Sequence, residues 1–327
     1  MNFTNVGTTG KVEGFALVKK CEVRVSKNGS KFLSMILSDK TGEIDAKYWD
    51  YQEGITPEIT EGSIVKVNGF ETEFKGTPQL KVEMIRPALD SDRINPSDFV
   101  PTSEYDPEAM YGEICRIAKG FKDHELAALL LAVYEKYKER LLIYPAAVRL
   151  HHAMRGGLLY HSLSIIRLCE KVSEIYPQVD RDLLITGAAL HDIGKCVEMD
   201  TDEYGVASRY TTRGNLLGHL VIGAIIVDET GKELGIPEET LMLVEHMILS
   251  HHGKPEYGAA VPPKFLEASI LAKMDELDAT LFEINDNVSD VETGEFTQRI
   301  WALDNTMLYN HGRTENTEPK ANLFREE

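Results

Sequence analysis

Histidine and aspartate side chains recur along the second half of the chain at intervals of about one helix and one turn. The series consists of His161, the pair His191-Asp192, His219, the pair His251-His252 and Asp275. The gaps between successive members are 30, 27, 32 and 23 residues. Imidazole and carboxylate together suit Mn, Fe, Co, Ni or Zn, whereas Ca²⁺ prefers oxygen ligands alone. The series therefore predicts the metal site of a hydrolase.

Helical periodicity surrounds every member of this series. From Pro107 onward the pattern predicts helices over 107–119, 123–139, 157–175, 181–195, 215–234, 238–250 and 263–284. The alternation of a parallel sheet is absent from this region of the sequence. The pattern thus predicts an all-α domain whose helices bring the histidines and aspartates together.

The N-terminal region has a different pattern. Five short alternating segments, separated by turn residues, lie within residues 11–86. Five strands in so short a stretch predict a small closed barrel of the OB type. Such barrels normally carry a helix between strands three and four, but Gln52 to Glu61 is a poor candidate because Gly54 and Pro57 interrupt it.

These patterns divide the chain into four parts. We expect a nucleic-acid-binding barrel at residues 1–90, a linker at 91–106, an all-α metallophosphohydrolase domain at 107–310 and a polar, mobile tail at 311–327. The fold class is therefore multidomain: an N-terminal five-stranded OB-type β-barrel followed by an all-α domain.

The composition restricts the class of binding partner and the cellular compartment. The net charge of −18 argues against a general nucleic-acid coat protein, but residues 1–90 carry 12 Lys and Arg against 13 Asp and Glu. Cysteines 21, 115, 169 and 196 have no paired spacing, which is typical of a reducing compartment. No signal peptide or membrane-spanning run is visible. We expect a cytoplasmic protein with no membrane partner, and assembly into homo-oligomers is left open.

Several sequence runs resemble the HD superfamily of helical phosphohydrolases. They are GGLLYHSLS at 156–164, AALHDIGK at 188–195, GHLVIGA at 218–224, SHHGKPEYG at 250–258 and EASILAKMDELDA at 267–279. In this resemblance His161, His191-Asp192 and Asp275 match the defining metal ligands. The additional His219 and His251-His252 are similar to the subset of the superfamily that holds two metals.

The N-terminal barrel restricts the resemblance to one family within the superfamily. A barrel ahead of an HD domain, with the run SKFLSMILSDKTGEIDAKYWD at 30–50, resembles the YhaM-type 3'-5' exoribonucleases of Gram-positive bacteria. The likeness covers residues 10–90 and 145–285. It implies an enzyme that degrades RNA from its 3' end.

Within a two-metal site, Asp192 is the candidate bridging ligand. His161, His191 and Asp275 would complete the coordination of one ion, while His219, His251 and His252 would coordinate the second.

Neighbouring helical residues point about 100° apart. Both His251 and His252 therefore reach a metal only if their helix ends there, as Gly253 and Pro255 favour. Otherwise one of them contacts a ligand instead, and the sequence leaves open which one. The expected cofactor is two divalent ions per chain, with Mn first and Co, Fe, Ni or Zn as alternatives.

Lys195 is the candidate for the second catalytic role beside Asp192. Its ammonium could contact the non-bridging phosphate oxygens, where charge concentrates; the alternative is an ordinary lysine at a helix C-terminus. Asp278 shares a helix face with Asp275 and could orient a ligand, or could be solvated. His151 and His152 are equally compatible with the substrate groove and with a structural role.

The barrel contributes candidate nucleic-acid contacts. Small barrels bind single strands by stacking bases on aromatic side chains along a basic groove. Because Lys47 and Trp49 share one face of their strand, that face is favoured, together with Lys31 and Phe32. For any single aromatic residue, a place in the small core is the favoured interpretation.

Three functions follow from these observations. The first is a metal-dependent 3'-5' exoribonuclease that hydrolyses single-stranded RNA to nucleoside 5'-monophosphates, with single-stranded DNA as a second candidate substrate. The second is a phosphohydrolase of a small nucleotide or cyclic dinucleotide, with the barrel as a regulatory module; the Gly-Tyr-Pro segment of such enzymes is not matched by residues 253–258. The third is a non-catalytic single-strand binder with a structural metal.

Overall fold

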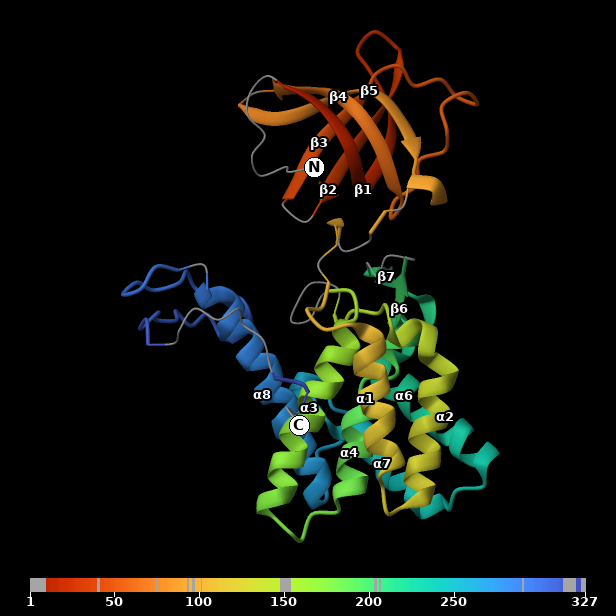
Figure 1. The fold of residues 1–327 in the computed structure, drawn as a ribbon, viewed down its shortest axis with the longest axis vertical. Helices are drawn as coiled ribbons and strands as arrows, with labels where there is room; N and C mark the ends of the chain where they lie inside the picture. Colours follow the sequence, from red (N-terminus) through yellow and green to blue (C-terminus); the bar gives the residue numbers. More distant parts are fainter. Residues whose placement is uncertain are drawn as a thin grey trace. The chain divides into compact units, whose positions relative to one another are not determined.

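A computed structural model describes most of the chain. It covers residues 10–39, 42–74, 76–92, 94–95, 98–100, 102–147, 154–202, 205, 207–289, 291–313 and 322–324. The chain separates into two compact units, one of residues 1–102 with 202–206 and one of residues 103–201 with 207–327. Figure 1 shows the first unit as red to orange strands and the second as yellow to blue helices.

The first unit is a closed five-stranded barrel in the strand order β1-β2-β3-β5-β4. Its strands are β1 (Lys11–Val25), β2 (Lys31–Asp39), β3 (Gly42–Tyr48), β4 (Ile64–Phe74) and β5 (Thr77–Pro87). The parallel pairing of β3 with β5 closes the barrel, and the other neighbours are antiparallel. The predicted OB-type barrel is confirmed.

Alternation builds the barrel core. Along β3, Ile44 and Ala46 point into the barrel, whereas Asp45 and Lys47 line a groove on its outer face. Residues 49–63, between β3 and β4, form turns and irregular chain without a helix. This agrees with the poor helical pattern of that segment.

Part of the expected linker packs onto the outside of the barrel. Phe99 and Val100 are buried and form a small apolar cluster with Leu17 and Ile64. The cluster holds this stretch against β1 and β4 of the same unit, so these two residues are anchored by apolar burial.

The second unit consists mainly of helices. They are α1 (Pro107–Lys119), α2 (His124–Leu141), α3 (Gly157–Ile175), α4 (Arg181–Leu190), α5 (Lys195–Glu198), α6 (Thr212–Leu234), α7 (Glu238–Ser250) and α8 (Leu266–Ser289). Short polar residues cap several N-termini: Asp106, Asp123, Asp180 and Thr211 each accept a hydrogen bond from a backbone nitrogen of the following turn. The faces of α3 and α4 that carry Leu163, Ile166 and Leu184 are fully buried in the core.

Two features of this unit differ from the sequence prediction. The helix expected over 181–195 ends at Leu190, and residues 191–194 form a turn before the short α5. The unit is also not entirely helical, because β6 (Met199–Thr201) and β7 (Ala207–Tyr210) form an antiparallel hairpin. These strands are too short for alternation to reveal them.

The C-terminal segment departs from the expectation of a mobile tail at three described residues, 322–324. Leu323 is fully buried in the helical core, and its carbonyl oxygen accepts a hydrogen bond of 2.7 Å from Nε of Arg167. The ring of Phe324 lies 5.2 Å from that of Tyr105. None of the helices that the structure describes combines the length and the apolar character that crossing a bilayer requires.

Candidate metal centre and nucleic-acid surface

His191 and Asp192 lie in the turn that follows α4, and both are almost completely buried. The backbone of His191 is still helical, with φ −52° and ψ −38°. Beyond it the hydrogen bonds tighten to the i→i+3 pattern, as from the nitrogen of Ile193 to the carbonyl oxygen of Leu190, so the spacing of side chains differs from that of a continuous α-helix. Helices α3, α6 and α8 and the turn that follows α7 supply the remaining side chains of the predicted series.

One group of donor atoms surrounds Oδ2 of Asp192. This oxygen lies 3.3 Å from Nε2 of His191 and 3.7 Å from Nε2 of His161. The two imidazole nitrogens are 3.3 Å apart. Oδ1 of Asp275, from α8, lies 3.2 Å from the His161 nitrogen and 3.9 Å from that of His191. Metal–ligand bonds of about 2.1 Å place neighbouring donor atoms roughly 3.0–3.5 Å apart, so this group has the dimensions of a metal shell.

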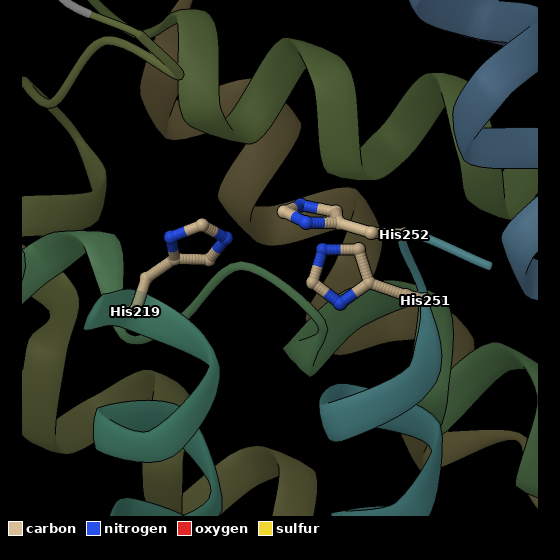
Figure 2. A group of neighbouring side chains, drawn as sticks. All are labelled: His219, His251 and His252. Atoms are coloured by element: carbon tan, nitrogen blue, oxygen red, sulfur yellow. The ribbon is translucent and has the colours of Figure 1, made fainter. Parts of the chain in front are cut away.

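A second group faces the other oxygen of the same carboxylate. Oδ1 of Asp192 lies 3.5 Å from Nε2 of His219 and 3.7 Å from Nε2 of His251. Candidate ligand atoms of His219, His251 and His252 lie within 4.8 Å of one another. Figure 2 shows His219 extending from one helix toward His251 and His252, which come from the end of another. Since α7 ends at Ser250, both members of the histidine pair reach this position.

Hydrogen bonds orient four of these imidazole rings. Nδ1 of His191 donates to the carbonyl oxygen of Ala188, and Nδ1 of His251 donates to that of Ile248, both at 2.8 Å. A donating Nδ1 leaves the lone pair on Nε2, the atom that faces the centre. The other two rings use carboxylates: His161 donates to Asp278 at 2.8 Å, and His219 donates to Glu198 at 3.1 Å.

Electrostatics set the charge states of the buried groups in this site. Burial opposes the ionisation of Asp192, but Lys195 and His191 hold its pKa well below the ordinary value. Burial also lowers the pKa of His251 and of His252, so both rings are neutral near neutral pH. For His161, burial acts in the same direction, but the carboxylates of Asp275 and Asp278 outweigh it and raise the pKa to about 10. Without metal this ring is therefore protonated near neutral pH, and a cation bound at its Nε2 would replace that proton.

Unsatisfied polar atoms test whether these residues fit a metal. Oδ1 of Asp192, Nε2 of His219 and Nδ1 of His252 are buried and have no hydrogen-bond partner within the described part of the chain. A buried polar atom without a partner is costly. A divalent cation would satisfy the first two, and the mixed nitrogen and oxygen donors suit the transition metals and zinc. The residues therefore fit the predicted cofactor class.

Lys195 is held at the centre by Asp192. Its Nζ lies 2.6 Å from Oδ2 of that carboxylate. Burial would lower the pKa of Lys195, but Asp192 outweighs this and raises it, so the side chain is cationic. A cation thus lies beside the same oxygen that faces His161 and His191.

Two carboxylates hydrogen-bond to the ligands, and the sequence analysis identified only one of them. Asp278 contacts both His161 and the hydroxyl of Ser164, in keeping with its spacing from Asp275. Glu198 was not anticipated. The available signal was a carboxylate one turn after Lys195 in an otherwise apolar run, and its contact with His219 depends on the packing of α6.

Glycines allow α6 to approach this turn. A Cβ atom at Gly194 would collide with the backbone carbonyl of His219, so only glycine permits the present spacing. Gly218 has φ 71° and ψ 159° and kinks α6 immediately before His219. The kink changes the direction of the helix at the residue before the ligand.

The barrel residues predicted to bind nucleic acid differ in their exposure and in their ion pairs. The ring of Trp49 is 46% exposed and stacks on Phe32 at 4.3 Å between centroids, while Phe32 itself is buried. Lys31 forms an ion pair with Glu53 at 2.5 Å, and Lys47 forms one with Asp45 at the same distance. Trp49 and Lys31 are therefore accessible, and both lysines already have acidic partners.

A groove of about 440 Å³ lies beside Lys47 on the outer face of β1, β2 and β3. Its cations are also paired, since Lys20 and Arg24 both contact Glu22, at 2.7 Å and 2.6 Å. The groove is thus polar and mixed in charge rather than uniformly basic. His151 and His152 lie outside the described residues.

Comparisons with known proteins agree with both units. The HD domain family matches residues 158–280, and the OB-fold nucleic acid binding domain family matches residues 11–88. The first match contains all the histidines and aspartates of the metal centre, and the second spans the barrel.

Similar curated proteins extend over nearly the whole chain. A protein of Listeria welshimeri named 3'-5' exoribonuclease YhaM is 39% identical over 93% of this chain and 96% of its own length. Its namesake from Bacillus licheniformis is 36% identical over 91% of this chain and 94% of its own length. Among solved structures, an OB-fold domain of replication protein A from Methanococcus maripaludis is 24% identical over 24% of this chain and 82% of its own, with a TM-score of 0.19.

Proposed function

Because the chain belongs to the family of YhaM 3'-5' exoribonucleases, we propose that it shortens single-stranded RNA from the 3' end and releases nucleoside 5'-monophosphates. The observation that carries the proposal is the position of Asp192 between two groups of donor atoms. Its Oδ2 faces His191 and its Oδ1 faces His219, at 3.3 Å and 3.5 Å. A carboxylate in this position is suited to bridge two cations in a phosphodiesterase.

The first group would hold one divalent ion through His161, His191, Asp192 and Asp275, and the second would hold another through Asp192, His219, His251 and His252. Mn is the first expectation, with Co, Fe, Ni or Zn as alternatives. Two bound cations lower the pKa of a water molecule and neutralise charge on the phosphate under attack.

The protein's own groups prepare the site for that reaction. Asp278 and Glu198 fix the orientation of His161 and His219, so the ligand nitrogens need no reorganisation. Lys195 provides a buried ammonium 2.6 Å from Asp192, from which it would contact a non-bridging phosphate oxygen. Such a contact stabilises negative charge as it develops on the phosphate.

The barrel would hold the strand upstream of the cleaved linkage. Trp49 offers an exposed ring on which a base can stack, with Phe32 packed beneath it. Lys31 and Lys47 would exchange their acidic partners for phosphates. This mode of binding needs no contact with a 2'-hydroxyl, so single-stranded DNA is a second expected ligand.

We place the enzyme in the cytoplasm because its cysteines 21, 115, 169 and 196 are all free thiols.

A direct test combines the purified full chain with Mn²⁺ and a 5'-labelled single-stranded RNA. Progressive shortening from the 3' end and release of nucleoside 5'-monophosphates are expected, with no turnover for the Asp192→Ala variant. A labelled DNA of the same sequence and a cyclic dinucleotide are assayed alongside. Intact RNA together with rapid cleavage of the cyclic dinucleotide would show instead that the enzyme hydrolyses small nucleotides.

A further inference from the structure

A pocket of about 280 Å³ adjoins the second metal group. One wall is the chain that follows α7, from His252 to Tyr257, and the other is the face of α8 that carries Ala272, Lys273 and Glu276. His252 lines this pocket and also belongs to the group of His219 and His251. Glu276 directly follows Asp275. A ligand in the pocket would therefore be next to the metal centre.

Tyr257 presents an aromatic surface at this pocket. Its side chain is 65% exposed, so packing of the core does not explain the ring. The backbone that carries it is ordered: the nitrogens of Tyr257 and Ala259 both donate to the carbonyl oxygen of Lys254, at 3.0 Å and 3.2 Å. A ring held on such a turn loses little further freedom when it binds a flat partner.

The turn also rests against the metal centre. Gly258 has φ 102°, and a Cβ atom at that position would lie 3.2 Å from Nδ1 of His252. Absence of a side chain there lets the backbone that follows Tyr257 approach the imidazole closely. The aromatic ring and the candidate ligand are thus connected through one short, rigid segment.

Two lysines and one glutamate line the pocket, which gives it one net positive charge in a chain whose net charge is −18. The ammonium of Lys254 lies over one face of the Tyr257 ring, 5.5 Å from its centroid, which leaves the opposite face for a base. Lys273 contacts Glu276 at 2.7 Å, so one side of the pocket also offers a carboxylate that can accept hydrogen bonds. Aromatic, cationic and acceptor groups together match a base, a phosphate and a sugar hydroxyl.

We propose that this pocket binds the 3'-terminal nucleotide of the substrate, with its base stacked on Tyr257. The inference rests on the proposed exoribonuclease function and adds the position of the nucleotide that is released. The volume of about 280 Å³ lies just below the range of roughly 300–1,000 Å³ for small-molecule sites, which suits one nucleotide and not several. Because every base has a π face, the subsite accepts all four bases.

The first experiment uses a substrate that lacks the 3'-terminal base but keeps the terminal phosphodiester linkage. Two RNA oligonucleotides are compared, one normal and one whose 3'-terminal nucleotide is abasic, and kcat/KM is measured for cleavage of the terminal linkage. The normal RNA should be preferred by about 5- to 150-fold, the range for stacking of one base. Tyr257→Ala should remove this preference by lowering only the rate on normal RNA, and Tyr257→Phe should retain it. An equal loss on both substrates in Tyr257→Ala would overturn the proposal.

The second experiment measures binding without turnover. Adenosine 5'-monophosphate and ribose 5-phosphate are titrated into the Mn²⁺-loaded protein by calorimetry. The first should bind more tightly by about 5- to 150-fold, and Tyr257→Ala should abolish the difference. Tyr176→Ala, which removes an exposed ring at the end of α3, is the matched control and should behave as wild type. Equal affinities in the wild type would refute the subsite.

The two experiments separate the subsite from the enzyme's function. If no RNA is degraded but the binding difference appears and depends on Tyr257, the exoribonuclease proposal fails while the nucleotide subsite stands. If RNA is degraded normally but neither preference appears, the subsite fails alone.

Discussion

One oxygen of Glu198 accepts hydrogen bonds from both the backbone nitrogen of His219, at 2.9 Å, and its Nδ1, at 3.1 Å. The carboxylate thereby holds the backbone and the ring of one residue in a single orientation. Hydrogen bonding to His219 outweighs burial and lowers the pKa of Glu198, so the acceptor is ionised. With Nδ1 engaged in this way, Nε2 faces Oδ1 of Asp192 at 3.5 Å. Glu198 is therefore a positioning residue for the second metal group.

Replacing Glu198 should weaken metal binding without removing a ligand. For Glu198→Ala we expect the apparent affinity for Mn²⁺ to fall by about 10- to 100-fold, the usual effect of losing a partner that orients a ligand. Excess Mn²⁺ should restore most of the RNA-degrading activity, which a damaged fold would not permit. Activity is measured across a Mn²⁺ titration, with the exposed Glu174→Ala as control. A Mn²⁺ dependence identical to that of the wild type would exclude this role.

The position of Asp192 predicts how metal content responds to substitution. Because its two oxygens face different donor groups, Asp192→Ala should lose both ions, whereas His219→Ala should lose the second ion and retain the first. Elemental analysis after equilibration with Mn²⁺ and dialysis measures the ratio of metal to protein. Loss of the same number of ions in both variants would contradict the bridging arrangement. Circular dichroism checks that each variant is folded.

In the barrel, Trp49 should account for more RNA affinity than the lysines. Trp49→Ala should weaken binding of a single-stranded RNA by about 5- to 150-fold, because one base loses its stacking partner. The effect of Lys47→Ala should be smaller, since this lysine is already paired with Asp45. Fluorescence anisotropy with labelled RNA compares these variants. The control is Trp301→Ala, which removes an indole that is 76% exposed in the helical unit.

Acid should destabilise the helical unit through Glu113. Hydrogen bonds from Arg116 and Arg167 outweigh burial and lower its pKa from 4.5 to about 2. A lowered pKa in the folded state stabilises the protein above the unfolded pKa, and this stabilisation disappears as the pH falls from about 4.5 toward 2.

Glu113→Gln lacks this titration. Between about pH 6 and pH 3, the free energy of unfolding should fall by about 1 kcal/mol more in the wild type than in the variant, after allowance for solvent screening. Urea unfolding followed by far-UV circular dichroism reports the helices. Parallel pH profiles of the two proteins would count against the ion pairs as a source of stability.

Much of the fold could be predicted from local patterns. Alternation in the sequence distinguished an outer and an inner face of β3, although Trp49 lies in the turn that follows this strand. Helical periodicity placed α1, α3 and α7 at their observed bounds. Local patterns failed where an element was short or interrupted. The hairpin of β6 and β7 and the end of α4 at Leu190 both depend on contacts with distant segments.

The sequence by itself determined which side chains are available for metal binding and that the helix over 238–250 ends before the histidine pair, since Gly253 and Pro255 act on their own neighbourhood. Only the tertiary structure decided that one oxygen of Asp192 faces His191 and the other faces His219. It also decided that Glu198 and Asp278 orient the ligands. The physical reason is that helical period sets the direction of a side chain about its own axis, whereas the packing of buried faces sets the rotation and spacing between helices.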